Sequence, residues 1–210
     1  MALPYVIEPM TPADLDEVMA IERASFPLPW SKRAFLSELS LPYSVFRVAR
    51  LRREEWGRVA GEVTAPRRWW SGRRSRPERP PVLGYTGFQV ILDEGHIMTV
   101  AVHPEHRRRG LGTLLLLDLF EQARLRGVRR LTLEVRVSNL AAQRLYQAFG
   151  FHLEGRRLRY YGDGEDALIM WSETLDSLES QARLEALRGQ LLARLEAQGV
   201  PDSGAGDFVR

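Results

Sequence analysis

The sequence contains no cysteine, which excludes disulfide bonds, cysteine nucleophiles and thiolate metal sites. It contains a single lysine, Lys32, so arginine supplies nearly all of its positive charge. No apolar run reaches the roughly 18 residues that a membrane-spanning helix needs. The segment from Met1 to Tyr5 lacks the basic and apolar regions of a signal peptide. We therefore expect a cytoplasmic protein that does not contact a membrane.

The composition fits one globular domain with appendages. The chain has 210 residues, of which 44% are hydrophobic, enough to bury a substantial core. Its four histidines lack the spacing of a metal-ligand set, so we expect no metal site. They are His96, His103, His106 and His152. The planar fork of arginine suits phosphate and carboxylate groups, which makes an anionic ligand plausible.

The pattern of apolar residues predicts alternating strands and helices. Strands are predicted over residues 5–8, 45–51, 82–92, 96–102, 130–135, 151–158 and 166–171. Helices are predicted from Thr11 to about Ser25, from Ser31 through Leu39, from the glycine-rich stretch to near Gly127, and over residues 139–149. Thr11, Ser31 and Asn139 are suited to cap the first free N–H groups of a helix, and Gly150 is suited to end one.

Two segments differ from the rest of the chain. The stretch from Arg52 to Pro81 holds nine arginines and three tryptophans and reads as an inserted loop. Residues 173–198 form a separate amphipathic helix, with Leu184, Leu187, Leu191 and Leu195 on one face. That face needs cover, either from the domain itself or from a second copy of the chain. Residues 199–210 are expected to be a disordered tail.

A glycine-rich stretch, Arg107-Arg108-Arg109-Gly110-Leu111-Gly112-Thr113, joins a predicted strand to a predicted helix. Backbone N–H groups and the positive end of a helix converge on an anion in such a loop. We expect Gly110 and Gly112, which lack a Cβ, to let the backbone approach the ligand closely. The stretch has neither the third glycine of a dinucleotide site nor the Gly-Lys-Ser/Thr of a P-loop. The remaining candidate ligand is a pyrophosphate such as that of coenzyme A.

The order of elements and several motifs resemble the GCN-five-related N-acetyltransferase (GNAT) family over residues 5–172. Arg107-x-x-Gly110-x-Gly112 resembles that family's acetyl-CoA loop. Further motifs resemble a bacterial subgroup, the RimI-type ribosomal-protein-alanine N-acetyltransferases. They are Leu133 to Asn139, Leu145-Tyr146, Phe149-Gly150-Phe151, Tyr160-Tyr161, Asp166-Ala167 and Ile169-Met170. The segment from Phe26 to Ser31 resembles a family Phe-Pro-Trp-Ser segment, but Leu28-Pro29 intervene, a longer form similar to archaeal N-terminal acetyltransferases.

The resemblance implies a fold, a reaction and a set of site residues. The fold is of the α/β (α+β) class, a central mixed and mostly antiparallel sheet flanked by helices, here with a C-terminal helical extension. The reaction is acetyl transfer from acetyl-CoA to a protein N-terminal α-amine, the expected substrate being an alanine-starting ribosomal protein of the small subunit. Glu134 is the implied general base, directly or through water, and Tyr146 the implied general acid.

The implied cofactor residues supply mainly backbone groups. They are Val100, Ala101, Val102, Arg107, Arg108, Arg109, Gly110, Leu111, Gly112, Thr113 and Asn139. Val100 to Val102 are expected to pair with the cofactor's pantetheine arm like an added strand, and Asn139 combines cofactor contact with its role as helix cap. The implied peptide groove is lined by Phe26, Trp30, Tyr160 and Tyr161.

Each role that the resemblance implies has a simpler alternative. Glu134 is otherwise a solvated or salt-bridged glutamate, Tyr146 a core tyrosine, and the groove aromatics core residues. The acceptor is otherwise a small amine or a lysine side chain, and the lysine ε-amine, with its higher pKa, needs a stronger base. Arginine interleaved with tryptophan from Arg52 to Pro81 is also typical of an RNA-binding patch, a different class of function, although a solvated insert has the same composition.

Overall fold

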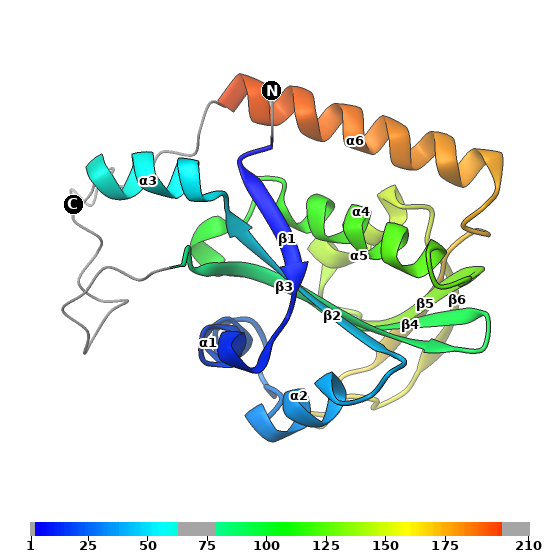
Figure 1. Ribbon diagram of the computed structural model, residues 1–210. Coiled ribbons are helices and arrows are strands. Elements are labelled where there is room, and N and C mark those ends of the chain that lie inside the picture. The colour runs from blue at the N-terminus through cyan, green and yellow to red at the C-terminus, as the bar shows by residue number, and fades with distance from the viewer. Residues whose placement is uncertain (1–2, 63–78, 199–210) are drawn as a thin grey trace, which may run out of the picture.

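One seven-stranded sheet organises the protein in the order β1-β2-β3-β4-β5-β7-β6. The computed structural model describes residues 3–62 and 79–198 (Figure 1). The strands are β1 (Tyr5–Pro9), β2 (Ser44–Leu51), β3 (Val82–Ile91), β4 (Glu94–Val102), β5 (Arg130–Arg136), β6 (His152–Arg157) and β7 (Ala167–Trp171). All neighbouring pairs are antiparallel except β4 and β5, which are parallel. This confirms the mixed, mostly antiparallel sheet expected from the sequence.

Helices cover both faces of the sheet (Figure 1). They are η1 (Pro12–Asp14), α1 (Leu15–Ser25), α2 (Lys32–Leu39), α3 (Arg53–Glu62), η2 (Pro104–His106), α4 (Leu111–Arg124), α5 (Leu140–Ala148) and α6 (Leu178–Gln198). One hydrophobic cluster joins α1 and α2 to the sheet, and a larger one joins it to α4 and α6. Leu115 and Leu119 of α4 are fully buried, and each such burial contributes about 2 kcal/mol. The helix that follows the glycine-rich stretch is therefore anchored along its length.

The predicted caps hold the helix ends in place. The N–H of Ala34 donates to Ser31 Oγ at 3.1 Å, and the N–H of Ala142 donates to Asn139 Oδ1 at 3.2 Å. At the start of η1 the carboxylate of Asp14 accepts hydrogen bonds from the N–H and the hydroxyl of Thr11, at 2.8 and 2.9 Å. These bonds satisfy N–H groups that a helix or turn would otherwise leave free.

The stretch from Arg52 to Pro81, expected to be a loop, begins instead with a helix. Helix α3 carries Glu54 and Glu55 in its first turn, where negative charge stabilises the helix dipole. Trp56 packs against the larger hydrophobic cluster, which ties the helix to the domain. The expectation is therefore wrong for the described part of this stretch. Residues 63–78, and the expected tail 199–210, lie outside the described residues.

Helix α6 covers part of its own domain. It begins at Leu178 and lies along α4, with Leu191 and Leu195 only 5% and 6% exposed (Figure 1). The domain itself therefore buries the leucines at this end of the helix, which was one of the two possibilities that the sequence left open. Among the described residues, no helix has both the length and the apolar character needed to cross a membrane.

Candidate active site

The two parallel strands separate at their carboxyl ends. Pairing between β4 and β5 ends at Ile97 and Leu133, yet β4 continues to Val102 and β5 to Arg136. Helices α4 and α5 follow these two strands, so both helix N-termini lie at the same end of the sheet. Ligands of open α/β sheets bind outside such carboxyl ends. The separation is therefore the first candidate for a binding site.

A bulge explains why β4 leaves its partner. Gly87 of β3 lies opposite Thr99, and Phe88 lies opposite Ile97, so Met98 is an extra residue in β4. An extra residue bends its strand and increases the local twist. The bend falls directly after the last residue of β4 that pairs with β5. No sequence pattern predicted it.

The bend leaves one edge of β4 open. Val100, Ala101 and Val102 pair with β3 on one side, and no strand of residues 3–62 or 79–198 pairs with their other side. The hydroxyl of Thr99 is buried without a hydrogen-bond partner among the described residues. Open backbone groups and an unpartnered hydroxyl fit an extended polar ligand, as expected for the pantetheine arm.

The glycine-rich loop lies beside this edge. Arg108 and Gly110 have φ of +61° and +86°, and Gly110 is the N-cap of α4. The next residues, Leu111, Gly112 and Thr113, form the first turn of α4, whose N–H groups have no intrahelical acceptor. Turns with left-handed residues at a helix N-terminus gather N–H groups into an anion-binding concavity. The loop therefore has the backbone conformation that a pyrophosphate site requires.

The two glycines of the loop face protein neighbours. A Cβ on Gly110 would lie 2.5 Å from Leu191 Cδ1 of α6, and one on Gly112 would lie 3.2 Å from Leu145 Cδ2 of α5. The close approach of a ligand to both glycines stays a prediction, and the structure adds a second reason for each. Gly110 allows the left-handed turn and the approach of α6, and Gly112 allows the approach of α5.

The arginines of the loop have separate environments. Arg107 donates through Nε to the carbonyl of Val102 at 3.1 Å and through a terminal nitrogen to Ser25 Oγ at 3.1 Å. It therefore ties the loop to β4 and to the end of α1. Arg109 is half-buried, and its charge is the second cause, after burial, that lowers the pKa of His106 to about 4.

Glu134 projects from β5 at the separation of the strands. Its Oε2 lies 2.7 Å from His96 Nε2, and its Oε1 lies 3.1 Å from a terminal nitrogen of Arg157. The hydrogen bond with His96 is the largest cause that holds the pKa of Glu134 below its usual value, with the charges of His96 and Arg157 adding to it. The side chain is 11% exposed. The carboxylate is thus ionised at neutral pH and directed by two partners.

Tyr161 contacts Glu134, and Tyr146 lies near Tyr161. The hydroxyl of Tyr161 donates to the backbone carbonyl of Glu134 at 3.3 Å, and the Arg136 guanidinium lies 4.0 Å from the Tyr161 ring centroid. Burial raises the pKa of Tyr161 to about 12. Burial also raises the pKa of Tyr146 on α5, and the neighbouring Tyr161 adds to that shift. Both phenols are therefore protonated at neutral pH.

Tyr146 also belongs to the core. It is 8% exposed, and its ring packs edge-on against Phe151 with the centroids 5.6 Å apart. Asn139 occupies the N-cap of the same helix, as its residue type predicted. The structure therefore bears out the capping role of Asn139, while its predicted cofactor contact and the acid role of Tyr146 stay predictions.

The predicted groove aromatics come from two segments that meet. A Cβ on Gly162, between β6 and β7, would lie 2.8 Å from Leu28 Cδ1, between α1 and α2. Trp30 packs on Phe35 with ring centroids 5.4 Å apart, and Phe26 lies partly buried against the same cluster. Tyr160 and Tyr161 contact each other edge-on, at 5.2 Å. The four predicted residues thus flank the contact between Leu28 and Gly162.

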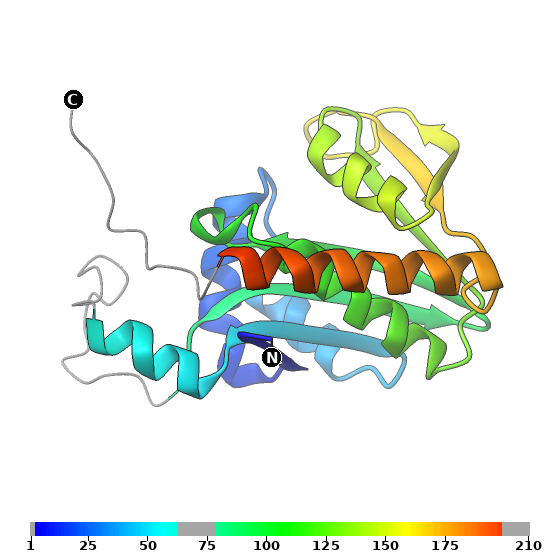
Figure 2. The same ribbon diagram turned by 90° about the horizontal axis from the view of Figure 1, so that it is seen from above.

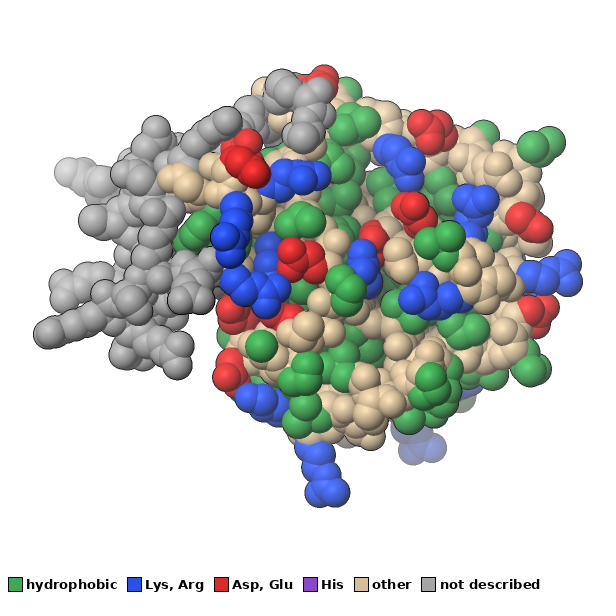
Figure 3. Space-filling model, in the orientation of Figure 1, with side chains coloured by type: hydrophobic (Ala, Val, Ile, Leu, Met, Phe, Trp, Pro, Cys, Tyr) green, Lys and Arg blue, Asp and Glu red, His purple; other side chains and the backbone are tan. Residues whose placement is uncertain are grey.

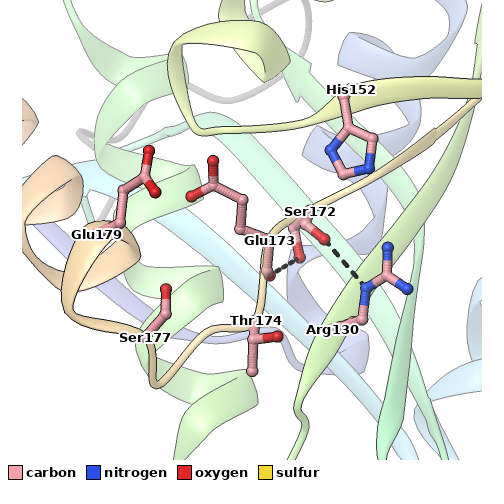
Figure 4. Close-up of a pocket in the computed structure, with 7 residues that line it drawn as sticks. All are labelled: Arg130, His152, Ser172, Glu173, Thr174, Ser177 and Glu179. Atoms are coloured by element: carbon pink, nitrogen blue, oxygen red, sulfur yellow. Dashed lines mark hydrogen bonds between the residues drawn. The ribbon is translucent and has the colours of Figure 1, made fainter.

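A separate hollow lies at the opposite end of β5. It has a volume of about 360 Å³ and is lined by residues that include Arg130, His152 and Glu173 (Figure 4). Arg130 donates to the carbonyl of Ser172 at 3.2 Å, and the Ser172 hydroxyl donates to the carbonyl of Glu173 at 2.7 Å. None of the predicted site residues lines it. Among residues 3–62 and 79–198, no group of His, Asp and Glu could hold a metal ion.

The sequence analysis did not identify two residues of the site, His96 and Arg157. The histidines were considered only as metal ligands, for which their spacing is unsuitable. The parallel register puts His96 opposite Thr132, two residues before Glu134, and residues two apart share a face of a strand. Pairing the predicted strands 96–102 and 130–135 in that register would have predicted that His96 lies next to Glu134.

The comparisons with known proteins agree with this geometry. Residues 15–151 match the model of the acetyltransferase (GNAT) family. A Bacillus subtilis (strain 168) protein provisionally named a ribosomal protein bS18-alanine N-acetyltransferase is 38% identical over 160 residues, covering 75% of this chain and 88% of that protein. The ribosomal protein bS18-alanine N-acetyltransferase of Escherichia coli (strain K12) is 33% identical over 167 residues, covering 78% and 94%.

The fold comparison reaches the same family. The crystal structure of the ribosomal-protein-S18-alanine N-acetyltransferase from Escherichia coli superposes with a TM-score of 0.61 at 30% identity, covering 80% of this chain and 92% of that one. The resemblance drawn from the motifs is thereby confirmed. The chain belongs to the GNAT family and is an acetyl-CoA-dependent N-acetyltransferase.

Proposed function

We propose that the protein acetylates the N-terminal alanine of ribosomal protein bS18, and so works in the cytoplasm. Its relatives at 33% and 38% identity carry that activity in their names. The observation that carries the proposal is the position of the Glu134 carboxylate, held by His96 and Arg157 where β4 and β5 separate. Tyr161, in one of the two aromatic segments, donates to the backbone carbonyl of Glu134 at 3.3 Å.

The residues around the separation fit acetyl-CoA, which supplies the acetyl group as a thioester. The N–H groups of Arg108 to Thr113 hold the pyrophosphate, and the open edge of Val100 to Val102 pairs with the pantetheine arm. Arg107 keeps the loop against β4. Asn139 lies at the N-terminus of α5 and contributes its amide. All of these groups bind and orient, and none of them moves a proton.

Glu134 accepts the proton that the attacking amine loses, directly or through one water. The lowered pKa of its carboxyl keeps it ionised at neutral pH. A free α-amino group has a pKa of about 7.7–8.0, so a weak base suffices. A lysine ε-amine, with a pKa near 10.4, needs a stronger one. The lowered pKa of Glu134 therefore favours an N-terminal acceptor over a lysine side chain.

Tyr146 donates a proton to the sulfur that leaves when the new nitrogen–carbon bond forms and the carbon–sulfur bond breaks. Burial keeps its phenol protonated, which is the state a donor needs. Phe26, Trp30, Tyr160 and Tyr161 line the groove that receives the first residues of the substrate. Their rings exclude water around an alanine side chain and leave the amine directed at Glu134.

A competition assay read by mass spectrometry tests this function. The protein and acetyl-CoA are mixed with a bS18 peptide starting with free alanine and with the same peptide N-blocked and carrying an internal lysine. Acetyl added at the alanine amine alone, at a rate that Glu134→Gln lowers, is the expected result. Transfer to the lysine peptide at an equal rate would refute N-terminal specificity while leaving the family assignment untouched.

RNA contact by the stretch from Arg52 to Pro81 stays a prediction of the sequence. On the described surface shown in Figure 3, basic and acidic side chains alternate without a broad basic patch. The prediction therefore depends on the residues of the stretch from Arg52 to Pro81 itself. A variant lacking those residues should bind ribosomal RNA more weakly and with a flatter salt dependence. Unchanged RNA binding would contradict the prediction.

A further inference from the structure

Helix α6 reaches from the far end of the domain to the glycine-rich loop (Figure 2). Leu191 is 5% exposed, and its Cδ1 fills the space that a side chain on Gly110 would need. One turn further, the exposed guanidinium of Arg194 donates a hydrogen bond to the backbone carbonyl of Arg108. The GNAT family model ends at residue 151, so this contact comes from outside the matched region.

The hydrogen bond from Arg194 acts on the most strained part of the loop. Arg108 has a φ of +61°, a conformation that residues with a Cβ rarely adopt and that persists only when the surroundings enforce it. A peptide unit is planar and trans, so its carbonyl and the following N–H point in opposite directions. By fixing the carbonyl of Arg108 toward α6, Arg194 turns the N–H of Arg109 away from α6.

We propose that α6 is a built-in clamp on the acetyl-CoA loop, in which Arg194 is a positioning residue for the loop N–H groups and Leu191 anchors the turn. The proposal rests on the function assigned to the loop above. Preorganised donors lose less entropy when an anion binds, so the clamp raises affinity for the cofactor's pyrophosphate without touching the acyl group. Arg194 also adds a positive charge beside the anion site.

The test uses the full chain and compares Arg194→Ala with Arg188→Ala. Both remove one exposed arginine from α6, but Arg188 pairs only weakly with Glu121, at 4.0 Å and with both side chains more than half exposed. Isothermal titration with coenzyme A should show a dissociation constant raised about tenfold in Arg194→Ala, the size of one lost hydrogen bond, and unchanged in Arg188→Ala. KM for acetyl-CoA should rise by a similar factor, with kcat at saturation nearly constant.

Amide hydrogen exchange in the free protein supplies a readout that needs no cofactor. The hydrogen-bonded amides at the two ends of the loop, Arg107 and Leu114, should exchange faster in Arg194→Ala than in the wild type or in Arg188→Ala, while β3 and β4 exchange equally in all three. Equal coenzyme A affinities for the two variants, or unchanged exchange in the loop, would overturn the clamp. If coenzyme A binds as expected but bS18 is not acetylated, the substrate proposal fails and the clamp stands.

Discussion

His96 Nε2 lies 2.7 Å from Glu134 Oε2, across two strands whose pairing ends at Ile97 and Leu133. The pair therefore lies at the point where β4 and β5 begin to separate. A carboxylate at that place is fixed by its neighbours, because His96 and Arg157 each hold one of its oxygens. Preorganised groups of this kind lose little by reorganisation when the reaction proceeds.

The first prediction concerns Glu134 itself. Glu134→Gln keeps the size of the side chain and removes its basicity, so kcat for the alanine peptide should fall by a factor of about 10² or more. The dissociation constant of coenzyme A should stay within twofold of the wild type, because the loop is untouched. Steady-state kinetics and titration calorimetry measure the two quantities. Nearly full activity in this variant would assign the base elsewhere.

The second prediction concerns His96. His96→Ala removes the largest cause of the lowered pKa of Glu134, so the pKa of that carboxyl should rise toward its ordinary value. Arg157 still holds one oxygen, so kcat should fall less than in Glu134→Gln, by about tenfold. A carboxyl titration followed by NMR on the labelled protein checks the shift. A pKa of Glu134 that does not move would contradict the role given to His96.

The third prediction distinguishes a role of Tyr146 as general acid from a purely structural role in the core. Tyr146→Phe keeps the ring that packs on Phe151 and removes only the hydroxyl. Thermal stability should change by less than about 1 kcal/mol, whereas kcat should fall by a factor of about 10². Tyr43→Phe, at a residue that is 46% exposed and outside the predicted site, is the matched control and should retain most activity. Equal kinetics for both variants would leave Tyr146 as a core tyrosine.

Local sequence patterns predicted the elements whose causes are local. Ser31 and Asn139 cap the helices they were assigned to, because a cap depends on three or four neighbouring residues. Helix α3 was missed because the arginine and tryptophan content of its surroundings outweighed the acidic first turn and the packing of Trp56. Its burial depends on residues distant in the sequence, which composition does not reveal.

The site was predictable only as far as motifs extend. Glu134 and Tyr146 were named from resemblance, but the pairing of Glu134 with His96 follows from the register between β4 and β5. The bulge at Met98, which opens the strands, also depends on that three-dimensional pairing. The contact between Leu191 and Gly110 joins residues far apart in the chain. From the sequence alone, Gly110 and Gly112 were therefore assigned only to ligand binding.

The fourth prediction concerns His106, at the entry to the loop. Burial, with the charges of Arg109 and His103, lowers its pKa from 6.5 to about 4. Between pH 6.5 and pH 4 the unfolded chain therefore binds a proton at His106 that the folded protein does not. The free energy of unfolding is highest above pH 6.5 and declines as the pH falls toward 4. Between pH 6.5 and pH 5 this loss should reach about 1 to 2 kcal/mol, allowing for partial exposure.

His106→Gln removes that titration. Urea unfolding at pH 8 and pH 5 should show a smaller loss of unfolding free energy in the variant, by about 1 to 2 kcal/mol. The measurement at pH 8, where the wild-type imidazole is neutral, controls for lost packing. His103, whose pKa is also lowered by burial, titrates in both proteins and leaves some pH dependence in the variant. Equal losses in both proteins would show that His106 is protonated in the folded state.

The fifth prediction concerns the contact between the loop and α6. Gly110→Ala forces a Cβ into a φ of +86° and to 2.5 Å from Leu191 Cδ1. Gly127→Ala is the matched control, since Gly127 has a φ of +75° and no atom within 4 Å of the added Cβ. The control carries backbone strain alone, about 1 to 2 kcal/mol, and Gly110→Ala should cost more than that.

A double-mutant cycle isolates the part of the Gly110→Ala destabilisation that comes from the contact with Leu191. In a Leu191→Ala background the added Cβ has room, so Gly110→Ala should cost about as much free energy of unfolding as Gly127→Ala does. Leu191→Ala alone is destabilising by about 2 to 5 kcal/mol, because it empties a buried site, and this term cancels in the cycle. An additive cycle would mean that α6 does not press on the loop. A coupled one would establish the packing on which the clamp depends, independently of any ligand.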